Sequence, residues 1–269
     1  MGTQRGQINW AINNHHYDAR RGVGGALIVK SPTKGDTLKV IGLIGGMSWE
    51  STVTYYRHIN EAVKERLGGL HSAKIILYSV DFHEVEQLQH SEDWEAAGLL
   101  LANAARALES AGADFLALCT NTMHKVAPAI EAAVRIPLFH IADPTAGEIK
   151  KAGFSLVGLL GTRFTMEQEF YKDRLRQRHA LRVLIPRQPD REIIHHVIYE
   201  ELCLGKIIEA SRSEYRRVIA DLVGQGAQAI ILGCTEISLL VGQQDSAVPL
   251  FDATVIHARK AAERALSPA

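Results

Sequence analysis

The chain contains one sequence motif twice, and this duplication constrains the fold more than any other feature. The first copy, GADFLALCTNTMH, begins at Gly112, and the second, GAQAIILGCTEIS, begins at Gly226, an interval of 114 residues. Each copy is a Gly-Ala turn, an apolar run of strand length and a polar cluster that leads into a helix. We therefore expect two strands that end in reactive side chains, at the edge where open α/β sheets bind ligands.

A second pair of segments repeats at nearly the same interval. VIGLIGG begins at Val40 and SLVGLLGT begins at Ser155, so Gly42 and Gly158 correspond across 116 residues. In both halves, strand-length apolar runs alternate with helix-length stretches, which predicts parallel sheets joined by crossover helices. The predicted fold is α/β, with two pseudo-symmetric halves that face each other across a cleft.

The domain boundaries follow from where this pattern starts, restarts and ends. We expect residues 38–138 together with 253–269 to form the first domain and residues 139–252 to form the second. The helix predicted for residues 253–266 would return to the first half. Residues 1–37 have no apolar periodicity, which predicts a disordered tail.

Composition limits the class of partner. Thirty Lys and Arg residues balance thirty Asp and Glu residues, so no basic field favours nucleic acid or an anionic membrane. No apolar run approaches the ~20 residues that span a bilayer, and the N-terminus lacks a secretory signal pattern. A small molecule is the expected partner, and the expected location is the cytoplasm. The three cysteines, Cys119, Cys203 and Cys234, lack CxxC spacing and predict free thiols.

The second motif places Cys234 where a strand opens into a helix. A helix dipole there would lower the thiol pKa from ~8.5, which suits a nucleophile, a metal ligand or a proton-transfer base. No histidine lies at ligand spacing from Cys234, and no histidine in the GCTE turn offers a base for acyl transfer. Two similar walls best suit proton transfer at both faces of one carbon, with no metal.

Four stretches together identify a resemblance. They are GGMSWEST (45–52), TNTMH (120–124), GTRFTMEQEFY (161–171) and GCTE (233–236). In this order and spacing they resemble the aspartate/glutamate racemase family of pyridoxal-phosphate-independent enzymes, over about residues 39–266. The resemblance implies two Rossmann-like domains, an active site in the interdomain cleft, no cofactor, an amino-acid substrate and a homodimer.

The family's catalytic pair is two cysteines, in Cys-Asn-Thr and Gly-Cys-Thr. Cys234 matches the second, but the first region reads Cys119-Thr120-Asn121-Thr122. Both the internal repeat and the motif put Thr120 in the catalytic place. Because side chains alternate along a strand, we expect Thr120 to face the substrate and Cys119 to pack inside, although a local bulge would reverse the two. A hydroxyl is a poorer acid and base than a thiol, which predicts a preference for one enantiomer, the L form.

The resemblance also implies the substrate contacts. We expect Asn121, Thr122 and Thr235 to hold the α-carboxylate and Glu236 to hold the ammonium group, with helix capping as the alternative role. The remaining predicted substrate-binding residues are Met47, Ser48, Gln89 and Thr165. His124 either orients the site or caps and packs, and Cys203 is expected to be a buried small apolar group.

Substrate selectivity stays open. Aspartate-selective members of the family carry an arginine and a lysine that have no match in this chain. Gln89 and Cys203 lie near the two positions where these residues are expected, and Arg163 or Lys206 could reach the site. The alternatives are a broad-specificity amino-acid racemase, or a hydantoin racemase, maleate isomerase or arylmalonate decarboxylase on the same scaffold. A non-catalytic two-lobed binding protein would share the cleft and need no thiol.

Overall fold

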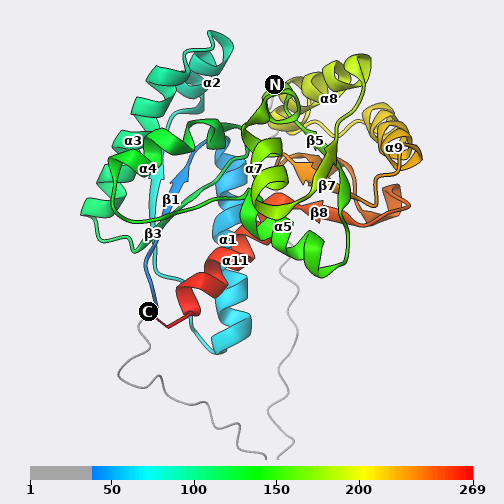
Figure 1. Ribbon diagram of the computed structural model, residues 1–269. Helices are drawn as coiled ribbons and strands as arrows, with labels where there is room; N and C mark the ends of the chain where they lie inside the picture. Colours follow the sequence, from blue (N-terminus) through cyan, green and yellow to red (C-terminus); the bar gives the residue numbers. More distant parts are fainter. Residues whose placement is uncertain (1–37, 269) are drawn as a thin grey trace, which may run out of the picture. The chain divides into compact units, whose positions relative to one another are not determined.

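The computed structural model describes residues 38–268 and contains two four-stranded parallel sheets (Figure 1). The predicted tail lies outside the described residues. The strand orders are β2-β1-β3-β4 and β6-β5-β7-β8, so both sheets have the same topology. The strands are β1 Ile41–Gly45, β2 Ile75–Ser79, β3 Phe115–Leu118, β4 Leu138–Phe139, β5 Leu156–Gly161, β6 Arg182–Leu184, β7 Ala229–Gly233 and β8 Leu250–Asp252.

The helices lie between the strands, as crossover connections require. In the first half they are α1 Trp49–Leu67, α2 Phe82–His90, α3 Trp94–Ser110, η1 Thr122–Val126 and α4 Ala127–Ala133. The second half contains α5 Ala142–Lys151, α6 Arg163–Glu167, α7 Glu169–His179, α8 Gln188–Glu200, η2 Leu202–Leu204, α9 Glu209–Gly224, α10 Ile237–Leu240 and η3 Gln243–Asp245. The helix α11, Ala253–Leu266, ends the fold. Two parallel sheets with crossover helices confirm the predicted fold class.

The two halves repeat each other in packing detail. A Cβ atom on Gly42 would lie 2.9 Å from a side-chain atom of Leu116, and one on Gly158 would lie 2.5 Å from Ile230. Leu108 and Leu222 are the next helix neighbours of these glycines. Leu116 and Ile230 are 114 residues apart, and so are Leu108 and Leu222. Glycine therefore has the same role in both halves, where it lets the covering helix approach the sheet.

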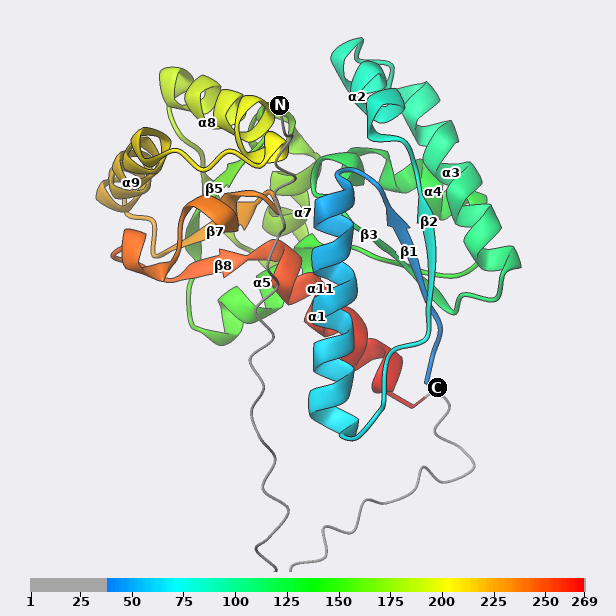
Figure 2. The ribbon, with the colours of Figure 1, turned by 180° about the vertical axis from the view of Figure 1, so that it is seen from behind.

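The C-terminal helix α11 packs lengthwise against α1 (Figure 2). It begins directly after β8 of the second sheet, and the Asp252 carboxylate caps it by accepting from the Thr254 and Val255 amides. Buried alanines of α11 join Tyr55 and Ile59 of α1 in one apolar cluster. This packing agrees with the idea of a returning helix, but the exact domain boundaries remain a prediction.

Two element boundaries have a local cause. Helix α8 ends at Glu200, because Glu201 leaves helical geometry and Gly205 closes the next turn with a positive φ. Strand β8 begins at Leu250, since Pro249 offers only its carbonyl, to the Ile230 amide. No helix in residues 38–268 is long and apolar enough to cross a membrane.

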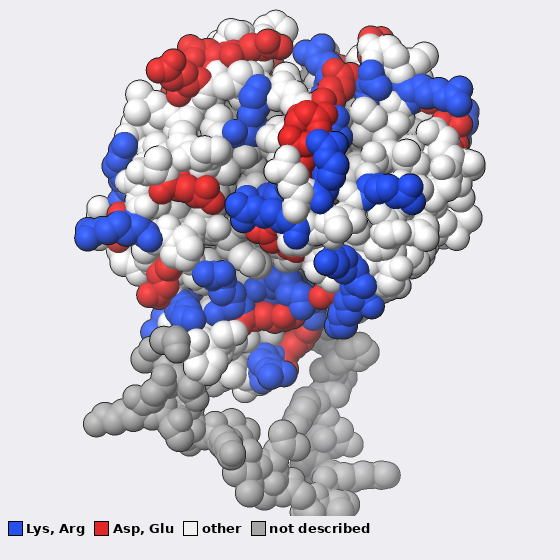
Figure 3. Space-filling view, in the orientation of Figure 1, with Lys and Arg blue, Asp and Glu red and all other residues white. Residues whose placement is uncertain are grey.

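Charge is mixed on the surface. Figure 3 shows Lys and Arg beside Asp and Glu across the visible face, without a large field of one sign. Ion pairs among the described residues include Arg259 with Glu65 and Lys260 with Glu148. This pattern agrees with the balanced composition.

Candidate active site

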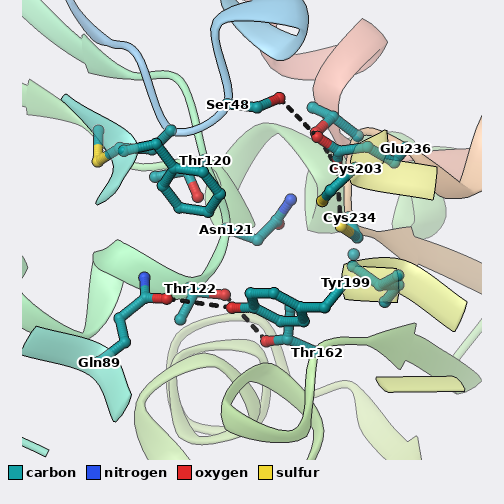
Figure 4. A pocket seen from close by; sticks show the side chains of 15 residues that line it. Ser48, Gln89, Thr120, Asn121, Thr122, Thr162, Tyr199, Cys203, Cys234 and Glu236 are labelled. Carbon is teal, nitrogen blue, oxygen red and sulfur yellow. Dashed lines mark hydrogen bonds between the residues drawn. The ribbon is translucent and has the colours of Figure 1, made fainter. Parts of the chain in front are cut away.

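The carboxyl ends of the central strands of both sheets meet at one pocket (Figure 4). Its lining residues come from the β1, β3, β5 and β7 ends and from α2, α8 and η2. They are Met47, Ser48, Phe82, Gln89, Thr120, Asn121, Thr122, Thr162, Ile198, Tyr199, Cys203, Gly233, Cys234, Thr235 and Glu236. The duplicated motifs therefore face the same space.

Cys119 and Thr120 point in different directions. Cys119 is fully buried in the apolar cluster that contains Tyr55 and Phe115, and burial raises the pKa of its thiol. Thr120 is half-buried and lines the pocket. The alternation of side chains along a strand thus separates the two neighbours, and Thr120 is the one that can touch a ligand.

Cys234 lies against the carboxylate of Glu236. Its thiol donates to Glu236 Oε2 over 3.0 Å, and the Thr235 hydroxyl donates to the same oxygen over 2.5 Å. Ser48 and Ser51, from the start of α1, donate to Oε1 over 2.9 and 2.8 Å. This carboxylate is therefore held by groups from both sheets, and it faces the thiol rather than open solvent.

The expected depression of the Cys234 pKa is wrong. Burial raises the pKa of the thiol well above its usual value, and the Glu236 carboxylate raises it further. The helix that follows, α10, has only four residues, so its dipole is small. Cys234 is consequently a neutral thiol that donates its proton to Glu236.

Asn121 has an unpaired amide. Its Oδ1 and Nδ2 atoms are both buried and have no hydrogen-bond partner, and Figure 4 shows the side chain at the centre of the pocket. An unsatisfied buried polar group costs ~1–3 kcal/mol. A ligand with both an acceptor and a donor would remove that cost.

A cluster of threonine hydroxyls closes one side of the pocket. Thr122 Oγ1 lies 2.9 Å from Thr162 Oγ1 and 3.4 Å from Thr165 Oγ1. Thr165, a predicted substrate contact, is fully buried behind Thr162 and is not among the residues that line the pocket. Thr162 lines it instead, and the sequence reasoning missed it because its position was read as the end of a strand.

Another wall comes from α8 and η2. The Tyr199 hydroxyl donates to Gln89 Oε1 over 3.1 Å, a contact between the two halves. Cys203 was expected to be buried, but it is only partly buried and lines the pocket. Tyr199 lies in α8 and Cys203 in η2, beyond the break at Glu201, so helical periodicity in the sequence does not place both on one wall.

The lining is uncharged except for Glu236. No Lys, Arg or His belongs to it within residues 38–268, and both Arg163 and Lys206 are exposed elsewhere. The cavity is about 30 Å³, which is enough for at least one water molecule. The described residues contain no cluster of three His, Cys, Asp or Glu side chains able to hold a metal ion.

Comparison with known proteins agrees with this geometry. Residues 44–261 match the Asp/Glu/hydantoin racemase family. The chain is 23% identical over 233 residues to the broad-specificity amino-acid racemase RacX of Bacillus subtilis, covering 82% of this chain and 95% of that one.

Two solved structures are similar over most of the chain. One is from Yersinia pestis, provisionally described as an Asp/Glu racemase, with 62% identity, a TM-score of 0.81, and coverage of 85% of this chain and 100% of that one. The other is an aspartate racemase homologue from Pyrococcus horikoshii OT3, with 37% identity, a TM-score of 0.74 and the same coverage. This chain belongs to the Asp/Glu/hydantoin racemase family and is an isomerase of the amino-acid racemase class.

Proposed function

We propose that this protein racemises aspartate and glutamate by proton transfer at both faces of the α-carbon, with Cys234 on one side and Thr120 on the other. The observation that carries this proposal is their placement: both line one pocket, each within two residues of the end of a central strand of its own sheet. The chemistry is that of the enzyme's own side chains, without pyridoxal phosphate or a metal.

Glu236 prepares the thiol for this reaction. Its Oε2 accepts the Cys234 proton, and the resulting thiolate removes the α-proton of the substrate. The Thr120 hydroxyl, or a water that it holds, returns a proton to the opposite face. Because a hydroxyl is a weaker acid and base than a thiol, the Thr120 side is slow, and the enzyme favours one enantiomer, the L form.

The substrate is held by polar groups that line the pocket. The Asn121 amide binds the α-carboxylate or the ammonium group, and its lack of any partner supports this role. Thr122 adds a hydroxyl donor. The Thr235 and Ser48 hydroxyls donate to Glu236, so toward the substrate they offer acceptor oxygens. Met47 and Gln89 border the side chain of the substrate. Before it takes up the thiol proton, the Glu236 carboxylate attracts the ammonium group through its charge.

A broad-specificity racemase is the second candidate. A distal carboxylate would meet no cation among the residues that line the pocket, and RacX, a broad-specificity enzyme, is a relative. Rates for aspartate, glutamate and several neutral amino acids decide between the two.

We further propose that the protein is a cytoplasmic homodimer. The dimer is supported by apolar groups on the exposed side of α1, which are Trp49, Val53 and Tyr56. Light scattering in solution tests the oligomeric state.

The test is exchange of the α-proton for deuterium in D₂O, followed by NMR, for both enantiomers of each amino acid. We expect Cys234→Ser to abolish exchange and Cys203→Ser, which changes a thiol with no bond to Glu236, to lose far less. Absence of exchange with every amino acid, together with unchanged ligand binding in Cys234→Ser, would instead identify a non-catalytic binding protein.

A further inference from the structure

His124 connects the Thr120 side of the pocket to the segment between the two sheets. Its Nδ1 lies 2.8 Å from the Thr120 carbonyl oxygen, and its Nε2 lies 3.2 Å from the Ile141 amide nitrogen. A carbonyl can only accept and an amide N–H can only donate, so Nδ1 carries the proton and Nε2 is the acceptor. The ring is therefore neutral, with both nitrogens used.

Two more buried histidines hold the same segment. His257 Nε2 donates to the Phe139 carbonyl over 2.7 Å, and His140 Nδ1 accepts from the Ala142 amide over 3.2 Å. The His124 and His140 rings lie 4.3 Å apart. The Ile141 end of the His124 bridge is thus part of a packed, hydrogen-bonded segment, which makes it a rigid anchor.

The Thr120 end is different, because Thr120 lies after the end of β3 and has no strand partner for its carbonyl among the described backbone bonds. We infer that His124 is a positioning residue, which holds the Thr120 hydroxyl toward the substrate through the carbonyl of the same residue. This inference rests on the proposed function. A displacement of ~1 Å at such a site can cost as much as ~100-fold in rate.

Two substitutions of similar size separate the two ends of the bridge. In His124→Asn the amide nitrogen takes the place of Nδ1 and keeps the donor to Thr120, while the bond to Ile141 is lost. In His124→Gln the amide oxygen takes the place of Nε2 and keeps the acceptor for Ile141, while the donor to Thr120 is lost. His140→Asn is the matched control, since it changes a neighbouring buried ring that has no bond to Thr120.

The readout is α-proton exchange from each enantiomer, with each variant made both in the otherwise unchanged chain and in Thr120→Cys. The enantiomer whose exchange becomes faster in Thr120→Cys is the one that reacts on the Thr120 side. The quantity compared is the rate of exchange on the Thr120 side divided by the rate on the Cys234 side. We expect His124→Gln to lower this ratio about 10-fold, and we expect the ratio in His124→Asn to stay near that of the unchanged chain. His140→Asn should leave the ratio unchanged.

If exchange falls equally on the Thr120 side and the Cys234 side, or if His124→Asn and His124→Gln give the same ratio of the two rates, the positioning role is overturned. His124 would then have a structural role. A variant that fails to fold is recognised by thermal unfolding, and the ratio in the other variant then decides. Failure of the proposed function has a different result, because the unchanged chain would show no exchange with either enantiomer.

Discussion

Cys234 and Glu236 form a thiol–carboxylate pair, with 3.0 Å between Sγ and Oε2. Three further side chains, Ser48, Ser51 and Thr235, donate to the same carboxylate, and two of these come from the other half of the molecule. The contact between the thiol and Oε2 lies within one half of the molecule, whereas the two serines that hold Oε1 come from the other half.

Glu236→Gln should lower Cys234-side exchange by about 100-fold or more, because an amide has nearly the same shape but cannot accept the thiol proton. Stability should change little, since the amide oxygen still accepts from the serines. Exchange kinetics and thermal unfolding measure the two effects. Unchanged exchange in a folded variant would show that Glu236 is not the acceptor.

Thr120→Cys should increase exchange of the slower enantiomer about 10-fold or more, since a thiol with a pKa near ~8.5 replaces a much weaker acid. The two directions of racemisation then become more equal, as measured by NMR in D₂O. Cys119→Ala is the control at the neighbouring core position and should leave the ratio of the two rates unchanged. Loss of exchange in Cys119→Ala alone would reverse the assignment.

Stability should fall as the pH drops below ~6.5. Burial lowers the pKa of His124 to about 3 and of His257 to about 4, and it also lowers that of His140. In the unfolded chain these groups bind protons below ~6.5, whereas in the folded chain they stay neutral down to their lowered pKa values. Unfolding thus takes up protons between about pH 6.5 and 4, and each histidine removes up to ~1.4 kcal/mol per pH unit.

Urea unfolding at pH 7, 5.5 and 4.5 measures this effect. Arg174 and His179 lower the pKa of the Asp143 carboxylate, although burial opposes them. Protonation of Asp143 therefore also destabilises the fold at low pH, but only when the pH falls below the usual aspartate pKa near 3.8. The window above pH 4 therefore reports mainly the histidines. His140→Asn should reduce the slope, and a slope equal to that of the unchanged chain would refute the assignment for His140.

Tyr199→Phe should weaken the contact between the halves at the pocket. Gln89 is buried, and its Oε1 would lose the Tyr199 donor, which costs about 1–2 kcal/mol. We expect KM to rise several-fold with a smaller change in kcat, because Tyr199 and Gln89 line the pocket but neither is a proposed proton donor or acceptor. Steady-state kinetics measure both constants, and a loss confined to kcat would contradict this role.

Local sequence determined the elements of this protein and the residues at the ends of its strands. The period of two along a strand separates Cys119 from Thr120, and the 114-residue repeat aligns Thr120 with Cys234. These signals act within a few residues or between equivalent positions, so they can be read without a structure. They also predict the α/β fold.

Tertiary structure decided which distant side chains complete the site. Tyr199 bonds to Gln89 across 110 residues, and Glu236 bonds to Ser48 across 188. It also decided that Cys234 is a neutral thiol, since burial and a neighbouring carboxylate outweigh a short helix. Such contacts depend on how two separately formed sheets pack together, and no local periodicity encodes that packing.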